Sequence, residues 1–182
     1  MRPTILLSIL ACLALVGPVP VLAQDGGAAE AQALREAGAL EARGWLDDAE
    51  AVLRVLMEEQ PGSVGGLFAL ERVLRSQGRP MEVLPFTRRY LDSFPTDGRV
   101  RYLRLRVFTG IDSTSALARE TESWIDLRPS DPEPYREASK LWVEAFGGER
   151  ALDLLRRGQV ATGDPATLAT EAGDLLLRLG RP

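Results

Sequence analysis

Three equally spaced prolines constrain this sequence more than any other feature. Pro61, Pro95 and Pro129 follow one another at intervals of 34 residues. Five residues before each proline stands a large apolar side chain, and twelve before it stands a small or apolar one. These two sets are Leu56, Tyr90 and Trp124, and Ala49, Val83 and Leu117. Because self-similarity at a fixed period is the signature of a repeat architecture, the chain is predicted to be built from copies of one unit.

Each unit has the pattern of two helices. In the first unit Leu34, Ala37 and Leu40 recur at helical spacing, Gly44 interrupts the run, and a second apolar run follows. The proline that closes a unit ends its second helix, because proline has no backbone N–H to donate. Ala, Leu, Arg and Glu, which dominate the composition, all favour helix. The sequence therefore predicts helices near 29–43, 47–59, 64–77, 81–93, 98–109, 114–127, 132–146, 148–161 and 165–179.

The units fall into four hairpins and a last single helix. Their predicted bounds are near 30–63, 64–97, 98–131 and 132–163. The fourth unit ends at Gly163, where the proline of the other units would stand. Directly after it, Asp164 and Pro165 have the pattern of a capping acid and a proline in the first helical position. That pattern places the start of the final helix at residue 165.

With this period and these positions, residues 30–180 resemble the tetratricopeptide repeat (TPR) family. Its unit is a 34-residue helix–turn–helix with a small residue in each helix and a closing proline. The resemblance implies an all-α fold, a right-handed superhelical solenoid of antiparallel helix hairpins, with about four repeats and a C-terminal helix. This repeat domain would span residues 24–182. In such a stack neighbouring hairpins share one core, and the concave inner face stays open to a partner.

The sequence departs from the family pattern in repeats two and three. Glu71 stands where the family has a small residue, and Pro85 falls within a second helix. Pro85 is compatible with that helix only in or near its first turn. In repeat three, Arg101 and Arg104 occupy positions where the family buries apolar residues. A shift of register by one residue would instead turn three apolar side chains inward: Val100, Leu103 and Val107.

The N-terminus has the pattern of a secretory signal peptide, predicted over residues 1–23. Arg2 supplies a positive charge, Ile5–Val16 forms an apolar run too short to span a bilayer comfortably, and Ala23 precedes a plausible cleavage point. We therefore expect a bacterial protein that is exported to the periplasm or secreted. Membrane association is expected only through an uncleaved signal, or through lipidation at Cys12, whose preceding residues loosely resemble a lipobox.

The mature chain lacks the residues that most catalytic and metal sites need. It has no histidine, and its single cysteine lies within the predicted signal peptide. Zinc sites and Ser–His or Cys–His nucleophile pairs are thereby excluded. We find no catalytic or metal-ligating residues and no cofactor motif, so we predict that the chain is not an enzyme. The net charge of −4 for the full sequence does not suit a nucleic-acid binder, and removal of residues 1–23 with Arg2 makes the mature chain more acidic still. Residues 64–110 nevertheless carry nine Arg against four acids.

TPR proteins usually bind extended peptides or partner helices through the first helix of each repeat. When the binding positions of the family are transferred to the equivalent repeat positions of this sequence, the resemblance implies eight inward-facing residues. These are Phe68, Arg72, Arg75, Arg99, Tyr102, Arg106, Arg136 and Lys140. Six cations and two aromatic rings on one face would favour an acidic peptide or protein, since Arg pairs with carboxylates and the rings cover apolar side chains. The alternative is that these cations lie on exposed ridges or pair with acids of adjacent helices.

These expectations combine into a protein–protein interaction scaffold of the bacterial periplasm or cell envelope, which holds partners in a concave, locally basic groove. A second hypothesis is a structural or oligomerisation module that packs on another subunit through the leucines of its final helix. Those residues are Leu168, Leu175, Leu176 and Leu179. A third hypothesis is an accessory subunit of an envelope enzyme or transport complex.

Overall fold

The computed structural model of the chain describes residues 25–181, and it is helical throughout that range apart from its turns. No strand occurs among these residues, which confirms the all-α prediction. The elements are α1 (Asp25–Ala42), α2 (Leu46–Glu59), α3 (Val64–Ser76), the 3-10 helix η1 (Pro80–Val83), α4 (Leu84–Ser93), α5 (Gly98–Gly110), α6 (Thr114–Leu127), α7 (Pro132–Phe146), α8 (Gly148–Thr162) and α9 (Ala169–Arg178).

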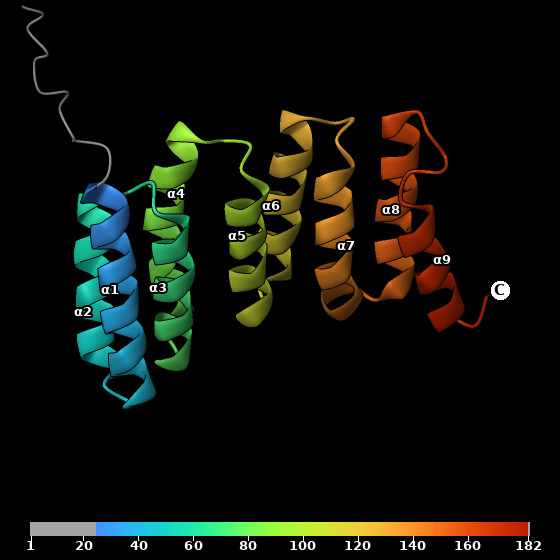
Figure 1. Cartoon of the computed structure of the whole chain (residues 1–182). Helices are drawn as coiled ribbons and strands as arrows, with labels where there is room; N and C mark the ends of the chain where they lie inside the picture. The colour runs from blue at the N-terminus through green and yellow to red at the C-terminus, as the bar shows by residue number, and fades with distance from the viewer. Residues whose placement is uncertain (1–24, 182) are drawn as a thin grey trace, which may run out of the picture.

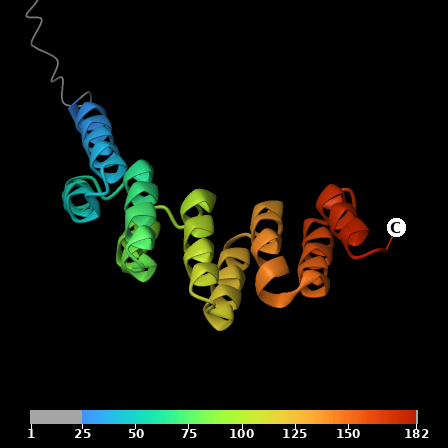
Figure 2. The same ribbon diagram turned by 90° about the horizontal axis from the view of Figure 1, so that it is seen from below.

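Consecutive helices pair as antiparallel hairpins that stand side by side in a row (Figure 1). The hairpins are α1/α2, α5/α6 and α7/α8, together with α3 and its return segment of η1 and α4, in which η1 makes the contact with α3; α9 follows them. The odd-numbered helices form one layer and the even-numbered helices form the other. The row bends, and the odd-numbered layer lies on the inside of the bend (Figure 2). The predicted solenoid of helix hairpins is therefore confirmed, and we call the odd-numbered helices its inner layer.

The same turn closes the first helix of several units. Gly44, Gly78 and Gly180 all adopt positive φ angles, of 78°, 75° and 70°. Glycine adopts this left-handed conformation without the steric cost that a Cβ atom would bring. In each case the N–H after the glycine donates to a carbonyl one helical turn back. These bonds are Trp45 N to Leu40 O (3.0 Å), Arg79 N to Leu74 O (2.7 Å) and Arg181 N to Leu176 O (2.9 Å).

Two apolar clusters form the core, and they meet at α5. The first runs from α1 to α5 and the second from α5 to α9. Val100, Leu103 and Val107 belong to the first cluster, whereas Leu105 belongs to the second. All four are fully buried. This confirms the shifted register of repeat three, in which Val100, Leu103 and Val107 turn inward.

Arg101 and Arg104 remain close to the core but lie on the side of α5 that faces α6. Arg104 makes two hydrogen bonds to the Glu120 carboxylate, of 2.8 and 2.9 Å, and Arg101 makes one of 3.2 Å. Arg101 also donates to the Pro95 carbonyl at 3.0 Å. A charged side chain is tolerated at such a site when it is paired and hydrogen-bonded. Glu120 therefore explains how two cations fit where the family has apolar residues.

The second helix of repeat two is not one continuous helix, so the predicted helix 81–93 is wrong in part. A short 3-10 segment, Pro80–Val83, comes first, and α4 starts at Leu84. Pro85 lies in the first turn of α4, as its missing N–H requires. The proline is therefore accommodated because the α-helix starts beside it.

The final helix begins at Ala169 rather than at residue 165. The Asp164 carboxylate accepts hydrogen bonds from Ala166 N (2.9 Å) and Thr167 Oγ1 (3.0 Å), and so closes a turn. Leu168 then adopts a left-handed φ of 64° with its side chain buried. Because that conformation cannot belong to a right-handed helix, the predicted cap at Asp164 holds a turn and α9 starts after it.

The predicted signal peptide, residues 1–23 with Cys12, lies outside the described residues. From Asp25 to Arg181, no helix is long and apolar enough to cross a membrane.

Candidate partner-binding surfaces

The eight residues predicted to bind a partner all lie on inner-layer helices. Phe68, Arg72 and Arg75 belong to α3, Arg99, Tyr102 and Arg106 to α5, and Arg136 and Lys140 to α7. Phe68 and Tyr102 are partly buried and pack against the first and second apolar clusters, respectively. The two rings therefore contribute to the core as well as to the surface.

Ion pairs connect successive helices of the inner layer. Arg72 of α3 donates from Nε and Nη2 to the Glu41 carboxylate of α1, at 2.8 and 2.7 Å. This two-pronged geometry is the strongest form of an Arg–carboxylate contact. The hydrogen bond from Arg72 lowers the pKa of Glu41 below its usual value. Arg72 is thus already engaged within the chain.

Glu71 collects two of the predicted cations. Its side chain is only 2% exposed. Arg106 of α5 donates to it at 3.3 Å, and Arg75 approaches the other oxygen at 3.6 Å. The contact of Arg75 is too long for a hydrogen bond, and half of its side chain is exposed. Arg75 is therefore the least constrained cation of this group.

The other three predicted cations also have carboxylate partners within the chain. Arg136 of α7 pairs with Glu171 of α9. Lys140 pairs with Glu137 one turn away (2.7 Å), and Arg99 pairs with Asp97 (2.7 Å). The structure thus favours the alternative in which the cations pair with acids of the same or adjacent helices. Only Arg75 and Arg106 come together, at Glu71, and the six cations do not form one anion-binding site. An acidic partner therefore stays a prediction.

The outer layer carries matching ion pairs. Arg89 of α4 pairs with Glu58 of α2, and Arg157 of α8 pairs with Glu122 of α6, at 2.9 and 2.8 Å. The two residues of each pair are 31 and 35 positions apart. In both pairs, the acid lies about one repeat before the arginine in the sequence and faces it across the stack.

Asp97 is held in its charged form at the start of α5. It is the N-cap of that helix and accepts hydrogen bonds from Arg99 N and from the Arg99 guanidinium. The Tyr90 hydroxyl of α4 also donates to it, at 2.7 Å. These bonds, with that from Arg99 the strongest, lower the pKa of Asp97 to about 2. Asp97 therefore ties the second repeat to the third.

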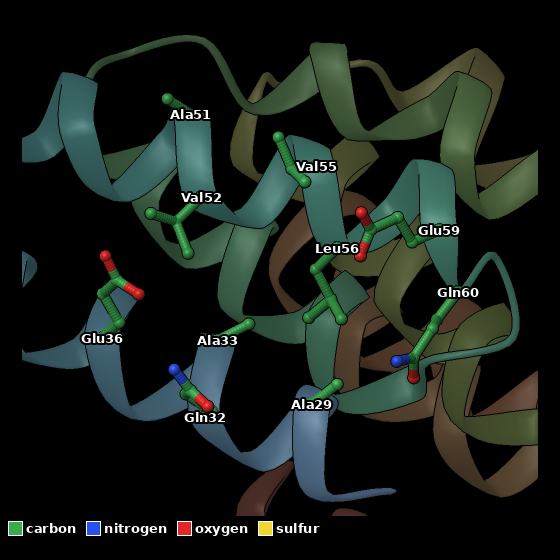
Figure 3. Close-up of a pocket in the computed structure, with 10 residues that line it drawn as sticks. All are labelled: Ala29, Gln32, Ala33, Glu36, Ala51, Val52, Val55, Leu56, Glu59 and Gln60. Carbon is green, nitrogen blue, oxygen red and sulfur yellow. The ribbon is translucent and has the colours of Figure 1, made fainter. Parts of the chain in front are cut away.

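An open groove between α1 and α2 was not predicted from the sequence. It has a volume of about 510 Å³, and we call it the N-terminal groove. Its lining residues are Ala29, Gln32, Ala33, Glu36, Ala51, Val52, Val55, Leu56, Glu59 and Gln60. Figure 3 looks into it with the remaining repeats behind α1 and α2. Its described lining residues all lie between positions 29 and 60, so the groove belongs to the first hairpin, at one end of the stack.

The chemistry of the N-terminal groove is apolar with acidic rims. Val55 is 57% exposed within it, and Ala29 and Ala51 are exposed beside it. Glu36 of α1 and Glu59 of α2 flank the apolar residues (Figure 3). The sequence feature that could have predicted this groove is Val55. It falls between the core residues Leu53 and Leu56 and hence on the opposite side of α2 from them.

The leucines of the final helix are mostly used inside the chain. Leu168 and Leu175 are buried, and Leu176 and Leu179 pack partly against the second cluster. Leu177, which was not among the predicted residues, is exposed. Packing within the chain therefore accounts for the apolar pattern that motivated the oligomerisation hypothesis.

From residue 25 to 181, no group of three acidic, His or Cys side chains is arranged to hold a metal ion.

This chain is similar to known proteins in structure but not detectably in sequence. The sequence matches no protein-family profile and no curated protein sequence. A structure from the functional characterization of Pseudomonas aeruginosa pilF aligns over 84% of this chain and 70% of its own, with a TM-score of 0.52 and 17% identity. TTC0263, a thermophilic TPR protein of Thermus thermophilus, aligns over 84% of both chains, with a TM-score of 0.50 and 15% identity. The chain therefore has the tetratricopeptide repeat fold.

Proposed function

We propose that this chain is a protein–protein interaction scaffold of the bacterial periplasm or cell envelope. The observation that carries this proposal is the inner layer, in which five helices stand side by side on the inside of one bend (Figure 2). Solenoids of stacked repeats use such extended concave faces to hold partners. The similarity in fold to a TPR protein supports the same conclusion.

The proposed partner is a protein or peptide that contacts α3, α5 and α7. Arg75 is the cation best placed to meet it, because its guanidinium has no hydrogen bond to Glu71 and is half exposed. Arg72 and Arg136 could exchange their carboxylates on Glu41 and Glu171 for those of an acidic partner. Such an exchange replaces one Arg–carboxylate pair by another, so it would give specificity more than affinity.

The proposed location rests on the sequence of residues 1–23. The positive charge, short apolar run and small residues at its end have the pattern of a cleaved secretory signal. An envelope scaffold would expose its inner layer to exported proteins.

Site-specific photo-crosslinking in the native cell tests this function. A photoreactive side chain is placed at position 75, which is about half exposed on the inner-layer helix α3, or at position 157, which is about half exposed on the outer-layer helix α8. Cross-links to a defined protein from position 75, and none from 157, are expected, and osmotic shock should release the adduct. Equal labelling from both positions would argue against an inner binding face, and retention of the adduct in the cytoplasm would argue against export.

A matched pair of variants separates binding from folding. With the photoreactive side chain kept at position 75, Arg72→Gln with Arg136→Gln removes two cations from the inner layer, whereas Arg89→Gln with Arg157→Gln removes two from the outer layer. The first double variant should lose the cross-linked adduct, and the second should keep it. Both should keep their helical circular dichroism, since each changes only partly exposed ion pairs.

A further inference from the structure

We propose that the N-terminal groove binds an amphipathic helix of a partner protein, whose apolar face is flanked by Arg or Lys. This site is separate from the inner layer on which the proposed function places a partner. Among the described residues, its lining comes from α1, α2 and Gln60, which follows α2.

The outward face of the first hairpin lacks the polar cover that the end of a stack normally has. On its other face the hairpin packs against α3, and Leu53 and Met57 are fully buried. On the outward face no helix from residue 25 to 181 covers Val55. Terminal repeats require a polar outer surface for solubility, and an apolar patch rimmed by polar residues marks an interaction site. The exposed apolar groove therefore calls for a partner.

The shape of the groove selects a helix as the occupant. It runs between two antiparallel helices, and the small side chains of Ala29, Ala33 and Ala51 leave room for a third backbone to approach. From Ala29 to Glu36 it follows α1 for two turns, about 10 Å. The backbone groups of α1 and α2 are bonded within their own helices, so they offer nothing to an extended strand. A helix satisfies its own backbone and needs only an apolar face.

The charges at the rim select basic flanks on that helix. Glu36 and Glu59 stand on the two sides of the groove, and none of the described residues that line it is Arg or Lys. In the part of the chain that the structure describes, neither carboxylate forms an ion pair, whereas Glu58 next to Glu59 is paired with Arg89. Two such acids around an apolar floor complement Arg or Lys beside a row of Leu or Ile.

Fluorescence anisotropy with the full chain and two synthetic peptides tests this site. Each peptide has about 18 residues, five helical turns, with Leu at helical spacing; one has Arg beside the Leu row and the other has Glu. The Arg peptide should bind, with affinity that falls as salt rises, and the Glu peptide should bind about tenfold more weakly or not at all. Equal binding of both peptides, or no binding of the Arg peptide by either the full chain or a chain that begins at Gln24, would overturn the proposal.

A valine pair provides the matched variants. Val55→Arg places a cation in the groove, whereas Val160→Arg makes the same change on α8, where the valine is 83% exposed. Val55→Arg should lower the affinity for the Arg peptide by about tenfold or more, and Val160→Arg should leave that affinity unchanged. The double variant Glu36→Gln with Glu59→Gln should lower the affinity for the Arg peptide several-fold and make that affinity less dependent on salt. Equal affinities for the two valine variants would contradict the site, provided that both melt like the parent chain.

Two other occupants appear as distinct outcomes. If the parent chain sediments as a dimer and Val55→Arg is monomeric, the groove is an interface between two copies and the proposal fails. If a chain that begins at Gln24 binds the peptide and the full chain does not, residues 1–23 compete for the groove, and the proposal holds for the processed chain. Only the absence of binding by both chains would then overturn it. Neither result changes the inner-layer cross-linking from position 75, so this inference and the proposed function can fail separately.

Discussion

Individual Arg–carboxylate pairs determine how successive hairpins meet in this protein. Arg72 with Glu41, and Arg106 with Glu71, join α1 to α3 and α3 to α5. Their energetic weight differs because their burial differs. Exposed pairs contribute less than about 1 kcal/mol, whereas a buried carboxylate that loses its partner is costly.

Arg106→Gln should therefore destabilise the protein by about 3 kcal/mol, because it leaves Glu71 buried with only the long contact to Arg75. Arg157→Gln is the control, since both members of its pair with Glu122 are about half exposed, and it should cost less than about 1 kcal/mol. Urea unfolding followed by circular dichroism measures both. Equal costs would mean that Glu71 is solvated.

Asp97→Asn should reveal a pH-dependent contribution to stability. The folded state lowers the pKa of Asp97 from 3.8 to about 2, so the ionised carboxylate stabilises the fold above pH 4, and this contribution is lost as the pH falls towards 2. Asn keeps the N-cap but removes the charge. The variant should be less stable by about 1–2 kcal/mol at pH 7, with a difference that shrinks below pH 4.

Urea midpoints at pH 7, 4 and 3 check this expectation. Asp153→Asn changes a carboxylate that is 70% exposed on α8 and should shift the midpoint little at any of these pH values. A destabilisation by Asp97→Asn that is the same at pH 3 as at pH 7 would show that the charge of Asp97 does not stabilise the junction between α4 and α5.

At the scale of helices, aromatic side chains within the apolar clusters hold hairpins together. Trp124 of α6 is 3% exposed and belongs to the second cluster. Trp124→Ala should cost about 3–5 kcal/mol, since a cavity replaces the ring. Trp45→Ala is the control, because Trp45 lies in a turn and is 53% exposed. A melting temperature that moves equally for the two variants would contradict the packing of α6.

The sequence predicted the helix positions correctly wherever the repeat period and the helix propensity agreed. The prediction was wrong where a local backbone conformation set the start of a helix. The 34-residue spacing located the hairpins, and the apolar spacing in α5 indicated its register. The start of α9 was misplaced because Asp164 and Pro165 are compatible with both a helix cap and a turn, and the left-handed Leu168 selects the turn. The 3-10 segment before Pro85 likewise follows from backbone geometry that residue patterns do not fix.

The candidate surfaces were less predictable than the helices. Repeat position correctly placed the eight predicted residues on inner-layer helices, yet it could not show that Arg72, Arg106 and Arg136 pair with acids one repeat away. Such pairs depend on how hairpins stack, which is a property of three dimensions. The N-terminal groove escaped prediction for the same reason, because it exists only where the stack leaves one face of α1 and α2 uncovered.

At the scale of the whole molecule, the hairpins form one continuous, elongated row (Figure 1). Small-angle X-ray scattering of the chain from Gln24 onward tests this most directly. A compact domain of that length would have a radius of gyration of about 15 Å. The solenoid predicts a clearly larger radius and an asymmetric distance distribution with a long tail. A radius of about 15 Å with a symmetric distribution would show a compact globule and contradict the stacked repeats and their open inner layer.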